Sequence, residues 1–354
     1  MTNREIYFAG GCFWGVEHFF KGVDGVVEAT PGYANGHIEH PTYQQVYTDT
    51  TGFAETVRVR YRPDRVSLET LVRLFFATID PLSVNQQGHD IGTRYRTGVY
   101  YTDPADLPLL SSLFAEVAAS SSAKTASFAL ELAKNGSSSA KMPDFAVEPS
   151  SVMPRDPSTV MPDPSPVIPR LVRGISLATE LEPLRNFYPA EEYHQDYLDK
   201  NPSGYCHLPL KAFRYLRLYQ DLRLLLGDEP DPIARMANIA AMIYERMKFF
   251  WVGFYRVAGE ELVLGPFQGP SACFRIKYGK GVCGTAWQRA ETVVVPDVEA
   301  FPDHIACSAL SKSEIVVPVL EEDAVVGVLD IDSKELESFD RFDAVFLELI
   351  VALL

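Results

Sequence analysis

The first part of the chain alternates between two hydrophobic patterns. Residues 55–61 alternate polar and apolar side chains with a period of two, which predicts a strand with one buried face. Residues 68–78 place apolar side chains at helical spacing, which predicts an amphipathic helix. Short strands and helices follow one another in this way from residue 4 to about residue 114, so we predict an α+β domain.

This pattern stops near residue 120. A stretch rich in serine and alanine leads into a segment with eight prolines between Pro143 and Pro169. Such a segment cannot form regular hydrogen-bonded structure, so we predict a disordered, low-complexity insert at about residues 120–173. The alternative, that the segment is untranslated sequence, stays open. We expect order to resume near Ile175, with a short helix over residues 190–198.

A second α+β unit is predicted over residues 211–354. Its pattern places helices first, then an antiparallel sheet whose last two strands form a hairpin, and then a closing helix. The expected helices span residues 212–226 and 232–247 and begin again at residue 339. The expected strands span residues 249–257, 261–265, 315–320 and 324–331.

Composition and charge are those of a globular chain with two cores. The 354 residues are 47% hydrophobic and 22% charged, enough for two domains of roughly 150 residues each. The net charge of -15 disfavours binding to nucleic acid or an anionic membrane, because both are polyanions. Residues 1–5 are too polar for a secretory signal, and no apolar run approaches the roughly 20 residues of a membrane span. We therefore expect a cytoplasmic protein.

The five cysteines are scattered and form no CxxC pair, so we expect no metal site and read them as buried inert thiols or redox-active ones. Cys12 has the most reactive surroundings, in the motif AGGCFWG at residues 9–15. The glycines permit a tight turn from strand to helix, and the start of a helix stabilises a thiolate. The rings of Phe13 and Trp14 would form an apolar floor for a small uncharged group.

The AGGCFWG motif resembles the signature of the A-type peptide methionine-(S)-sulfoxide reductases. The likeness continues through GFAE at residues 52–55, GHDIGTRYR at 88–96, EYHQDY at 192–197 and NPSGYC at 201–206. It covers residues 4–118 and about 175–208. It implies that residues 1–210, apart from the insert, fold as the family's α/β sandwich, a ferredoxin-like plait.

The chemistry of this family fits the residue types. A sulfoxide sulfur is a poor electrophile until its oxygen is protonated, so a thiol nucleophile needs a proton donor nearby. The resemblance implies that Cys12 is the nucleophile and Glu55 the acid. Cys206 would then condense with the sulfenic acid left on Cys12; sulfoxide reduction by this enzyme class is established thiol chemistry. Further substrate-binding residues implied by the resemblance are Phe13 and Trp14 for the methyl group, and Tyr43, Asp90 and Tyr95 for the oxygen and nearby water.

The residues alone leave blander interpretations open. Glu55 could be a solvated strand carboxylate, and Tyr43 and Tyr95 ordinary half-buried tyrosines. The possible metal ligands His37, His40, His194 and Glu192 lack the spacing of a zinc site. No further recycling cysteine precedes the next domain, so the resemblance implies that thioredoxin reduces the disulfide between Cys12 and Cys206 directly, with NADPH acting through thioredoxin reductase.

The carboxy-terminal region resembles a GAF domain. With WVGFY at residues 251–255, GKGVCG at 279–284, GVLDID at 327–332 and three cysteines, it is similar to the free methionine-(R)-sulfoxide reductases. This likeness makes Cys307 the nucleophile, Cys273 the resolving thiol and Cys283 an alternative partner beside the pocket. It makes Trp251 and Tyr255 walls of the pocket, and Glu314, Asp330 and Asp332 its carboxylates.

An acidic pocket suits a free amino acid. The ammonium group needs a counter-charge, and crowded carboxylates raise one another's pKa until one can donate a proton. We therefore predict a bifunctional enzyme that reduces peptide-bound and free S-sulfoxide in one domain and free R-sulfoxide in the other. The alternative is a methionine-(S)-sulfoxide reductase fused to a non-catalytic GAF sensor domain.

Overall fold

The computed structural model describes residues 2–119, 177–303, 305, 308–322 and 324–354. The described residues 2–113 and 178–303, 305, 308–322 and 324–354 belong to one compact unit. The predicted insert at about residues 120–173 lies outside the described residues.

The first sheet has the strand order of a ferredoxin-like plait. Its strands run β7-β6-β1-β3-β2-β8, and all neighbours are antiparallel except β6 and β7. The central order β6-β1-β3-β2, with α1 after β1 and α3 after β3, is the βαββαβ arrangement of the ferredoxin-like plait that the family resemblance implies. The elements are β1 (Arg4–Gly10), α1 (Phe13–Lys21), β2 (Val26–Ala34), β3 (Ala54–Tyr61), α3 (Leu68–Thr78), β6 (Thr97–Tyr101), β7 (Glu180–Pro183) and β8 (Phe187–Pro189).

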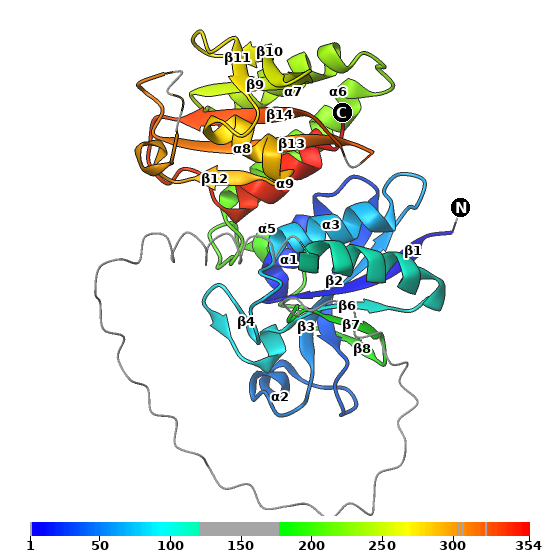
Figure 1. Cartoon of the computed structure of the whole chain (residues 1–354). Coiled ribbons are helices and arrows are strands. Elements are labelled where there is room, and N and C mark those ends of the chain that lie inside the picture. Colours follow the sequence, from blue (N-terminus) through cyan, green and yellow to red (C-terminus); the bar gives the residue numbers. More distant parts are fainter. Residues whose placement is uncertain (1, 120–176, 304, 306–307, 323) are drawn as a thin grey trace, which may run out of the picture. The chain divides into compact units, whose positions relative to one another are not determined.

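Helices α1 and α3 pack on this sheet (Figure 1). Phe8 of β1 stacks on Phe20 of α1 and on Phe75 of α3, with ring centroids 4.8 and 4.7 Å apart. All three rings are buried, and burial of each contributes on the order of 2 kcal/mol to stability. The predicted strand at residues 55–61 and helix at residues 68–78 are both confirmed.

Short elements surround this sheet, and one differs from its prediction. They are α2 (Tyr43–Tyr47), β4 (Gln86–Gln87), β5 (Asp90–Ile91), the 3-10 turns η1 (Thr93–Tyr95) and η2 (Pro104–Asp106), and α5 (Tyr197–Lys200). The helix predicted over residues 190–198 is wrong, because that segment forms turns and α5 begins only at Tyr197. Asp196 has a left-handed backbone with φ of 56°, which separates the turns from the helix.

The second sheet is entirely antiparallel, in the order β11-β10-β9-β14-β13-β12. The predicted hairpin is β13 paired with β14, and the predicted helices are present. The strands are β9 (Trp251–Ala258), β10 (Glu261–Gln268), β11 (Arg275–Lys277), β12 (Val293–Val295), β13 (Ser313–Glu321) and β14 (Ala324–Ser333). The helical elements are α6 (Leu210–Leu226), α7 (Pro232–Met247), α8 (Gly281–Arg289), η3 (Val298–Ala300) and α9 (Arg341–Val351).

Helices α6 and α9 are joined by a buried polar contact. Asp343 forms a capping box at the start of α9, and its carboxylate also accepts the Tyr215 hydroxyl at 2.8 Å and the Lys211 ammonium at 2.8 Å. The Tyr215 ring stacks on Phe346 with centroids 5.3 Å apart. One buried carboxylate thus fixes both the start of α9 and its partner helix.

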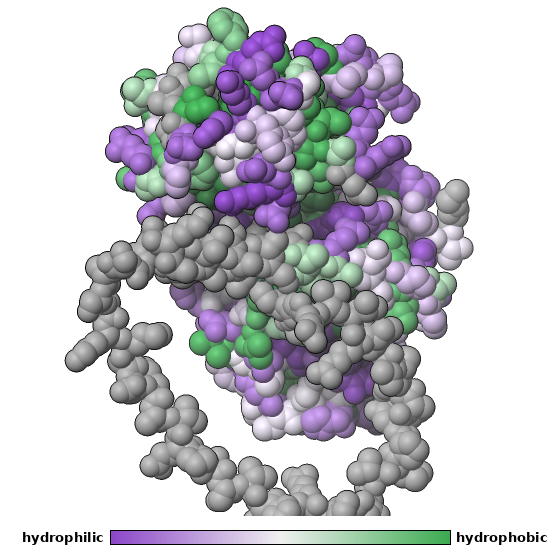
Figure 2. Space-filling model, viewed as in Figure 1, coloured by the Kyte–Doolittle hydropathy of each residue, from purple (hydrophilic) through white to green (hydrophobic). Residues whose placement is uncertain are grey.

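Hydrophilic side chains are spread over the described residues on the face shown in Figure 2. Within the described residues, no helix combines the length and the apolar composition needed to cross a membrane.

Removing the Tyr215 hydroxyl should destabilise the second sheet and its helices. We expect Tyr215→Phe to lower the free energy of unfolding by about 1–3 kcal/mol, because a buried carboxylate oxygen of Asp343 loses its donor. Denaturant titration followed by Trp251 and Trp287 fluorescence, in a Trp14→Phe background, reports this region alone. Tyr219→Phe on the same helix is the matched control. Equal unfolding midpoints for the two variants would contradict the assignment.

Candidate active sites

Cys12 lies at the turn between β1 and α1, where it is the N-cap residue of α1 and only 6% exposed. Gly11, just before it, has φ of 82°, and a Cβ there would lie 2.6 Å from the Gln87 Cβ atom. Only glycine fits both the backbone conformation and the space. The predicted strand-to-helix turn is therefore present, and it holds the thiol almost completely out of water.

Glu55 caps the helix that follows this thiol. It lies on β3 and is 1% exposed, and its Oε2 accepts the backbone N–H of Phe13 at 3.1 Å. The Cys12 side chain makes no capping hydrogen bond, so Glu55 supplies the acceptor that the first turn of α1 needs. This hydrogen bond sets the carboxyl group beside the turn that carries Cys12.

Burial keeps both groups in their uncharged forms. It raises the pKa of Glu55 to about 8, an effect that the Phe13 N–H and the Arg94 charge reduce. Burial also raises the pKa of the Cys12 thiol well above its usual range, and the charge of Glu55 raises it further. The Trp14 N–H acts in the opposite direction. The expected thiolate at the start of the helix is therefore corrected to a buried thiol, because desolvation outweighs the backbone donor.

Tyr43 and Tyr95 belong to the same electrostatic environment. Burial raises the pKa of each hydroxyl, and the charge of Glu55 is the next cause for both. The Arg94 guanidinium lies 4.4 Å from the centre of the Tyr95 ring. Asp49 fixes that arginine by accepting its Nη1 at 2.5 Å and its backbone N–H at 2.9 Å.

Two further side chains, Glu191 and His194, support the first site. Glu191 was not singled out from the sequence, and His194 was considered only as a possible metal ligand. Glu191 accepts the Tyr33 hydroxyl and the Tyr43 backbone N–H, both at 2.7 Å. His194 is buried and accepts the Trp14 indole N–H at 3.1 Å, while burial lowers its pKa and keeps it neutral. His194 thus orients Trp14, whose ring stacks on Tyr197 at 3.7 Å.

Cys206 packs against the first turn of α1. A Cβ at Gly15 would lie 3.1 Å from the Cys206 sulfur and 3.1 Å from the His207 ring, so the glycine lets this loop approach. The thiol is free and half-buried, and its charge is among the causes that raise the pKa of Cys12. Asp90 accepts the hydroxyl of Tyr205, the residue before Cys206, at 3.0 Å. The Asp90 carboxylate therefore holds the loop that brings Cys206 to α1.

His207 is a site neighbour that the sequence reasoning missed. Burial lowers its pKa to about 4, so it is neutral, and its Nε2 would lie 3.7 Å from a Cβ at Gly11. His207 therefore lies beside Gly11, directly before Cys12, and beside Gly15, three residues after it. Its place directly after Cys206 was the signal available in the sequence.

Strand register assembles a second site. Glu314 of β13 pairs with Asp332 of β14, which pairs with Trp251 of β9. Asp330, two positions before Asp332, pairs with Gly253. Cross-strand partners share a face of the sheet, so these acids and Trp251 project from the same face. A Cβ at Gly253 would lie 2.3 Å from the Trp251 ring, so glycine makes room for the indole.

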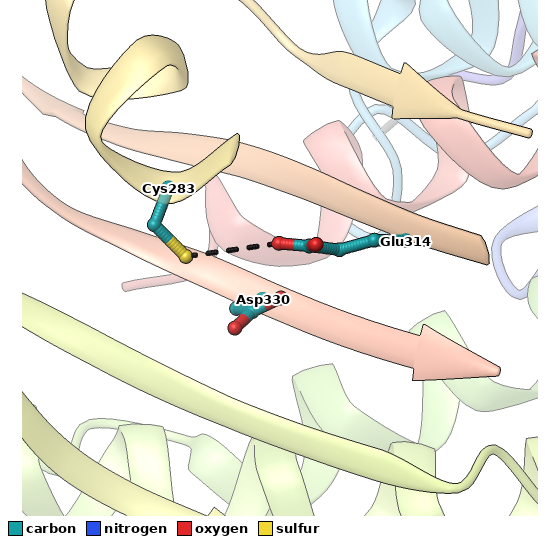
Figure 3. Close-up of side chains that lie close together, drawn as sticks. All are labelled: Cys283, Glu314 and Asp330. Carbon is teal, nitrogen blue, oxygen red and sulfur yellow. Dashed lines mark hydrogen bonds between the residues drawn. The ribbon is translucent and has the colours of Figure 1, made fainter. Parts of the chain in front are cut away.

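Helix α8 closes this site over the acids. The Cys283 sulfur lies 4.0 Å from Oε1 of Glu314, and Figure 3 shows the two side chains directed toward each other above β14. Burial raises the pKa of Cys283, Glu314 and Asp330 far above their usual ranges, and neighbouring carboxylates add to each shift. The pKa of Asp332 rises to about 6, again because it is buried.

The aromatic residues and a cysteine-bearing loop complete the pocket. Its cavity has a volume of about 30 Å³ and is lined by Trp251, Tyr255, Cys283 and the three carboxylates. The Tyr255 hydroxyl donates to the Cys273 carbonyl at 3.1 Å, which ties Cys273 to the pocket wall. Among the described cysteines, Cys12, Cys206 and Cys283 are free thiols and Cys273 is disulfide-bonded. Cys307 lies outside the described residues.

Comparison with known families identifies both domains. The peptide methionine sulfoxide reductase family matches residues 4–135 and 173–221, and the GAF domain family matches residues 231–354. The two matches define an oxidoreductase joined to a GAF domain. The chain belongs to the peptide methionine sulfoxide reductase family and carries a GAF domain after the reductase, as the sequence motifs predicted.

Individual relatives match one domain each. Peptide methionine sulfoxide reductase MsrA of Clostridium acetobutylicum is 39% identical over 211 residues, which cover 60% of this chain and 98% of that enzyme. GAF domain-containing protein A of Dictyostelium discoideum is 54% identical over 145 residues, covering 41% of this chain and 92% of that protein. The solved free methionine-R-sulfoxide reductase of Neisseria meningitidis is 50% identical, covers 41% of this chain and 88% of its own, and has a TM-score of 0.40.

The charge of Glu55 should control the Cys12 thiol. Glu55 is ionised above pH of about 8, before Cys12 titrates, so Glu55→Gln should lower the pKa of Cys12. The pH dependence of Cys12 alkylation, resolved by mass spectrometry, measures this value. Asp90→Asn removes a weaker negative influence and should produce a smaller decrease. An equal or larger effect of Asp90→Asn would contradict the assignment.

Proposed function

We propose that the chain is a bifunctional methionine sulfoxide reductase that uses cysteine chemistry in both domains. The first domain would act on S-sulfoxide in proteins and in the free amino acid, and the GAF domain on free R-sulfoxide. The observation that carries the proposal is the desolvated carboxyl of Glu55, which is bonded to the N–H of Phe13 beside the Cys12 thiol.

In the first step, Glu55 protonates the sulfoxide oxygen while the Cys12 sulfur attacks the sulfoxide sulfur. The oxygen passes to Cys12 as a sulfenic acid, methionine leaves with its thioether restored, and the thiol proton balances the proton that Glu55 supplied. A carboxyl with a pKa of about 8 is protonated at neutral pH and can act as this acid. Tyr43, Tyr95 and Asp90 would hold the oxygen and nearby water, and Phe13 and Trp14 would receive the methyl group.

The Cys206 thiol would then resolve the sulfenic acid. It displaces the hydroxyl from Cys12 to form a disulfide and water. The Gly15 position favours this step, since it lets the Cys206 sulfur approach the first turn of α1. We propose that the dithiol of thioredoxin reduces the Cys12–Cys206 disulfide by exchange, with NADPH consumed by thioredoxin reductase and no cofactor bound to this chain.

The GAF pocket supports a second reductase activity through its residues. Asp332 has a pKa of about 6 and is ionised at neutral pH, so it offers a counter-charge for the ammonium group of free methionine sulfoxide. The aromatic walls of the pocket suit the methyl group. The proposed nucleophile is Cys307, with Cys273 as resolving thiol and Cys283 as alternative partner. The disulfide at Cys273 favours redox use of that cysteine. The proposal also includes a protein-repair role for the first domain, in the cytoplasm under oxidative stress.

Glu55 should give the first reaction a distinct pH profile. The protonated form is the active one, so single-turnover reduction of a peptide S-sulfoxide should be constant below pH of about 8 and fall above it. Glu55→Gln should slow this step by about 10²–10⁴-fold. The matched control is Glu17→Gln, because Glu17 is a buried carboxyl of α1 with a pKa of about 7 that bonds the Asp196 N–H instead. Equal losses in both variants would refute the assignment of Glu55.

Separated sulfoxide diastereomers test which domain reduces which stereoisomer. Wild type, Cys12→Ser and Cys307→Ser are offered S- and R-sulfoxide, each free and in a peptide, with thioredoxin and its reductase. We expect Cys12→Ser to lose only S activity and Cys307→Ser to lose only free R activity. Free R turnover that survives Cys307→Ser, or that wild type lacks, would favour the alternative of a reductase fused to a sensor domain.

A further inference from the structure

We propose that the pocket of the GAF domain is also a binding site for a zinc ion, held by Cys283, Glu314 and Asp330. The cysteine spacing did not predict metal binding, because the three ligands come from α8, β13 and β14 and meet only in the folded domain. The inference concerns metal binding and does not depend on the proposed reductase activity of this domain.

The ligand atoms have nearly the separation that zinc requires. One ligand atom from each of the three residues lies within 4.8 Å of the others, and all three residues are buried (Figure 3). Bonds of about 2.3 Å to sulfur and about 2.1 Å to oxygen, at a tetrahedral angle, place those two atoms about 3.6 Å apart. The separation of Cys283 Sγ and Glu314 Oε1 is 4.0 Å. Small side-chain rotations would close the remaining gap.

An independent observation indicates an absent ligand. Asp330 is only 7% exposed, lines the cavity, and its Oδ1 has no hydrogen-bond partner among the described residues. A buried carboxyl oxygen without a partner is costly, and a cation that displaces the carboxyl proton and binds there would offset that cost. The cavity volume of about 30 Å³ is sufficient for an ion.

The donor set selects the metal. One thiolate and two carboxylates suit zinc or cobalt, whereas magnesium and calcium prefer oxygen ligands alone. Asp332, which pairs with Glu314 across the hairpin and lines the same cavity, or a water would complete four-coordination. A metal in this position would occupy the space beside Trp251 and Tyr255, so a molecule that enters the pocket would have to displace it.

Direct titration tests the site. The reduced full-length chain is titrated with Zn²⁺ in competition with a chromogenic chelator, and with Co²⁺ to record the thiolate-to-metal charge-transfer band. We expect the wild type to bind Zn²⁺ at this site. Both Cys283→Ser and the nearly isosteric Glu314→Gln should bind Zn²⁺ more than about 100-fold more weakly. Loss of a residue that hydrogen-bonds to a metal ligand costs about 10–100-fold in affinity, and loss of the ligand itself should cost more. Cys283→Ser should also lose the cobalt band, and excess Mg²⁺ should not displace Zn²⁺.

Matched variants locate the bound metal. Cys12→Ser removes the other thiol that lies beside a buried carboxyl, and Cys273→Ser removes the cysteine tied to the pocket wall; both should bind as wild type does. Circular dichroism and unfolding midpoints establish that each variant is folded, with Cys283→Ala replacing Cys283→Ser if the latter unfolds. The proposal is overturned if the wild type does not bind Zn²⁺. It is also overturned if the folded Cys283 variant and Glu314→Gln both bind Zn²⁺ with wild-type affinity. Loss of Zn²⁺ binding in Cys12→Ser or in Cys273→Ser would overturn it as well.

Discussion

Desolvation of a carboxyl group beside a thiol is the constraint on which both candidate sites depend. Burial shifts the pKa of Glu55 from 4.5 to about 8, which favours the protonated form by roughly 5 kcal/mol more than in an exposed carboxyl group. This contribution to stability is complete at pH values below about 4.5 and is lost as the pH rises through about 8. Folding energy is therefore used to keep an acid protonated where a sulfoxide oxygen would need its proton.

The two domains reach this condition on unrelated sheets. In the first, a strand carboxyl caps the helix that begins after the cysteine, and the Phe13 N–H fixes the pair. In the second, the antiparallel register places three carboxyl groups on one face of the sheet, and α8 places the Cys283 sulfur beside them. Backbone geometry sets the acid and the sulfur close together in both cases. In the proposed mechanism, the acid of the first site donates a proton. The second site has more acidic groups than one proton transfer needs, and this is why we propose a cation there.

Local hydrophobic patterns in the sequence predicted most of the helices and strands. The period-two strand at residues 55–61, the helix at residues 68–78 and the β13–β14 hairpin each depend on near neighbours, and each was predictable. The helix predicted at residues 190–198 is wrong because the apolar and acidic residues of this segment fit a helix, whereas its tertiary contacts require turns. Glu191 bonds Tyr33 and Tyr43 of distant elements, and that demand overrides local propensity.

The candidate sites divide in the same way. The motifs predicted Cys12, Glu55 and Cys206 as site residues, and these roles stay predictions. Neither the capping bond to Phe13 nor the packing of His207 against the Cys12 turn can be read from spacing. The unpartnered oxygen of Asp330 is likewise a property of the folded pocket.

The protonation state of Glu55 tests the central claim most directly. Infrared difference spectra between wild type and Glu55→Gln record the C=O stretch of a protonated carboxyl group, without substrate or turnover. A band present at neutral pH in wild type, lost as the pH rises through about 8, is the predicted result. A difference spectrum that contains only carboxylate bands at neutral pH would contradict it.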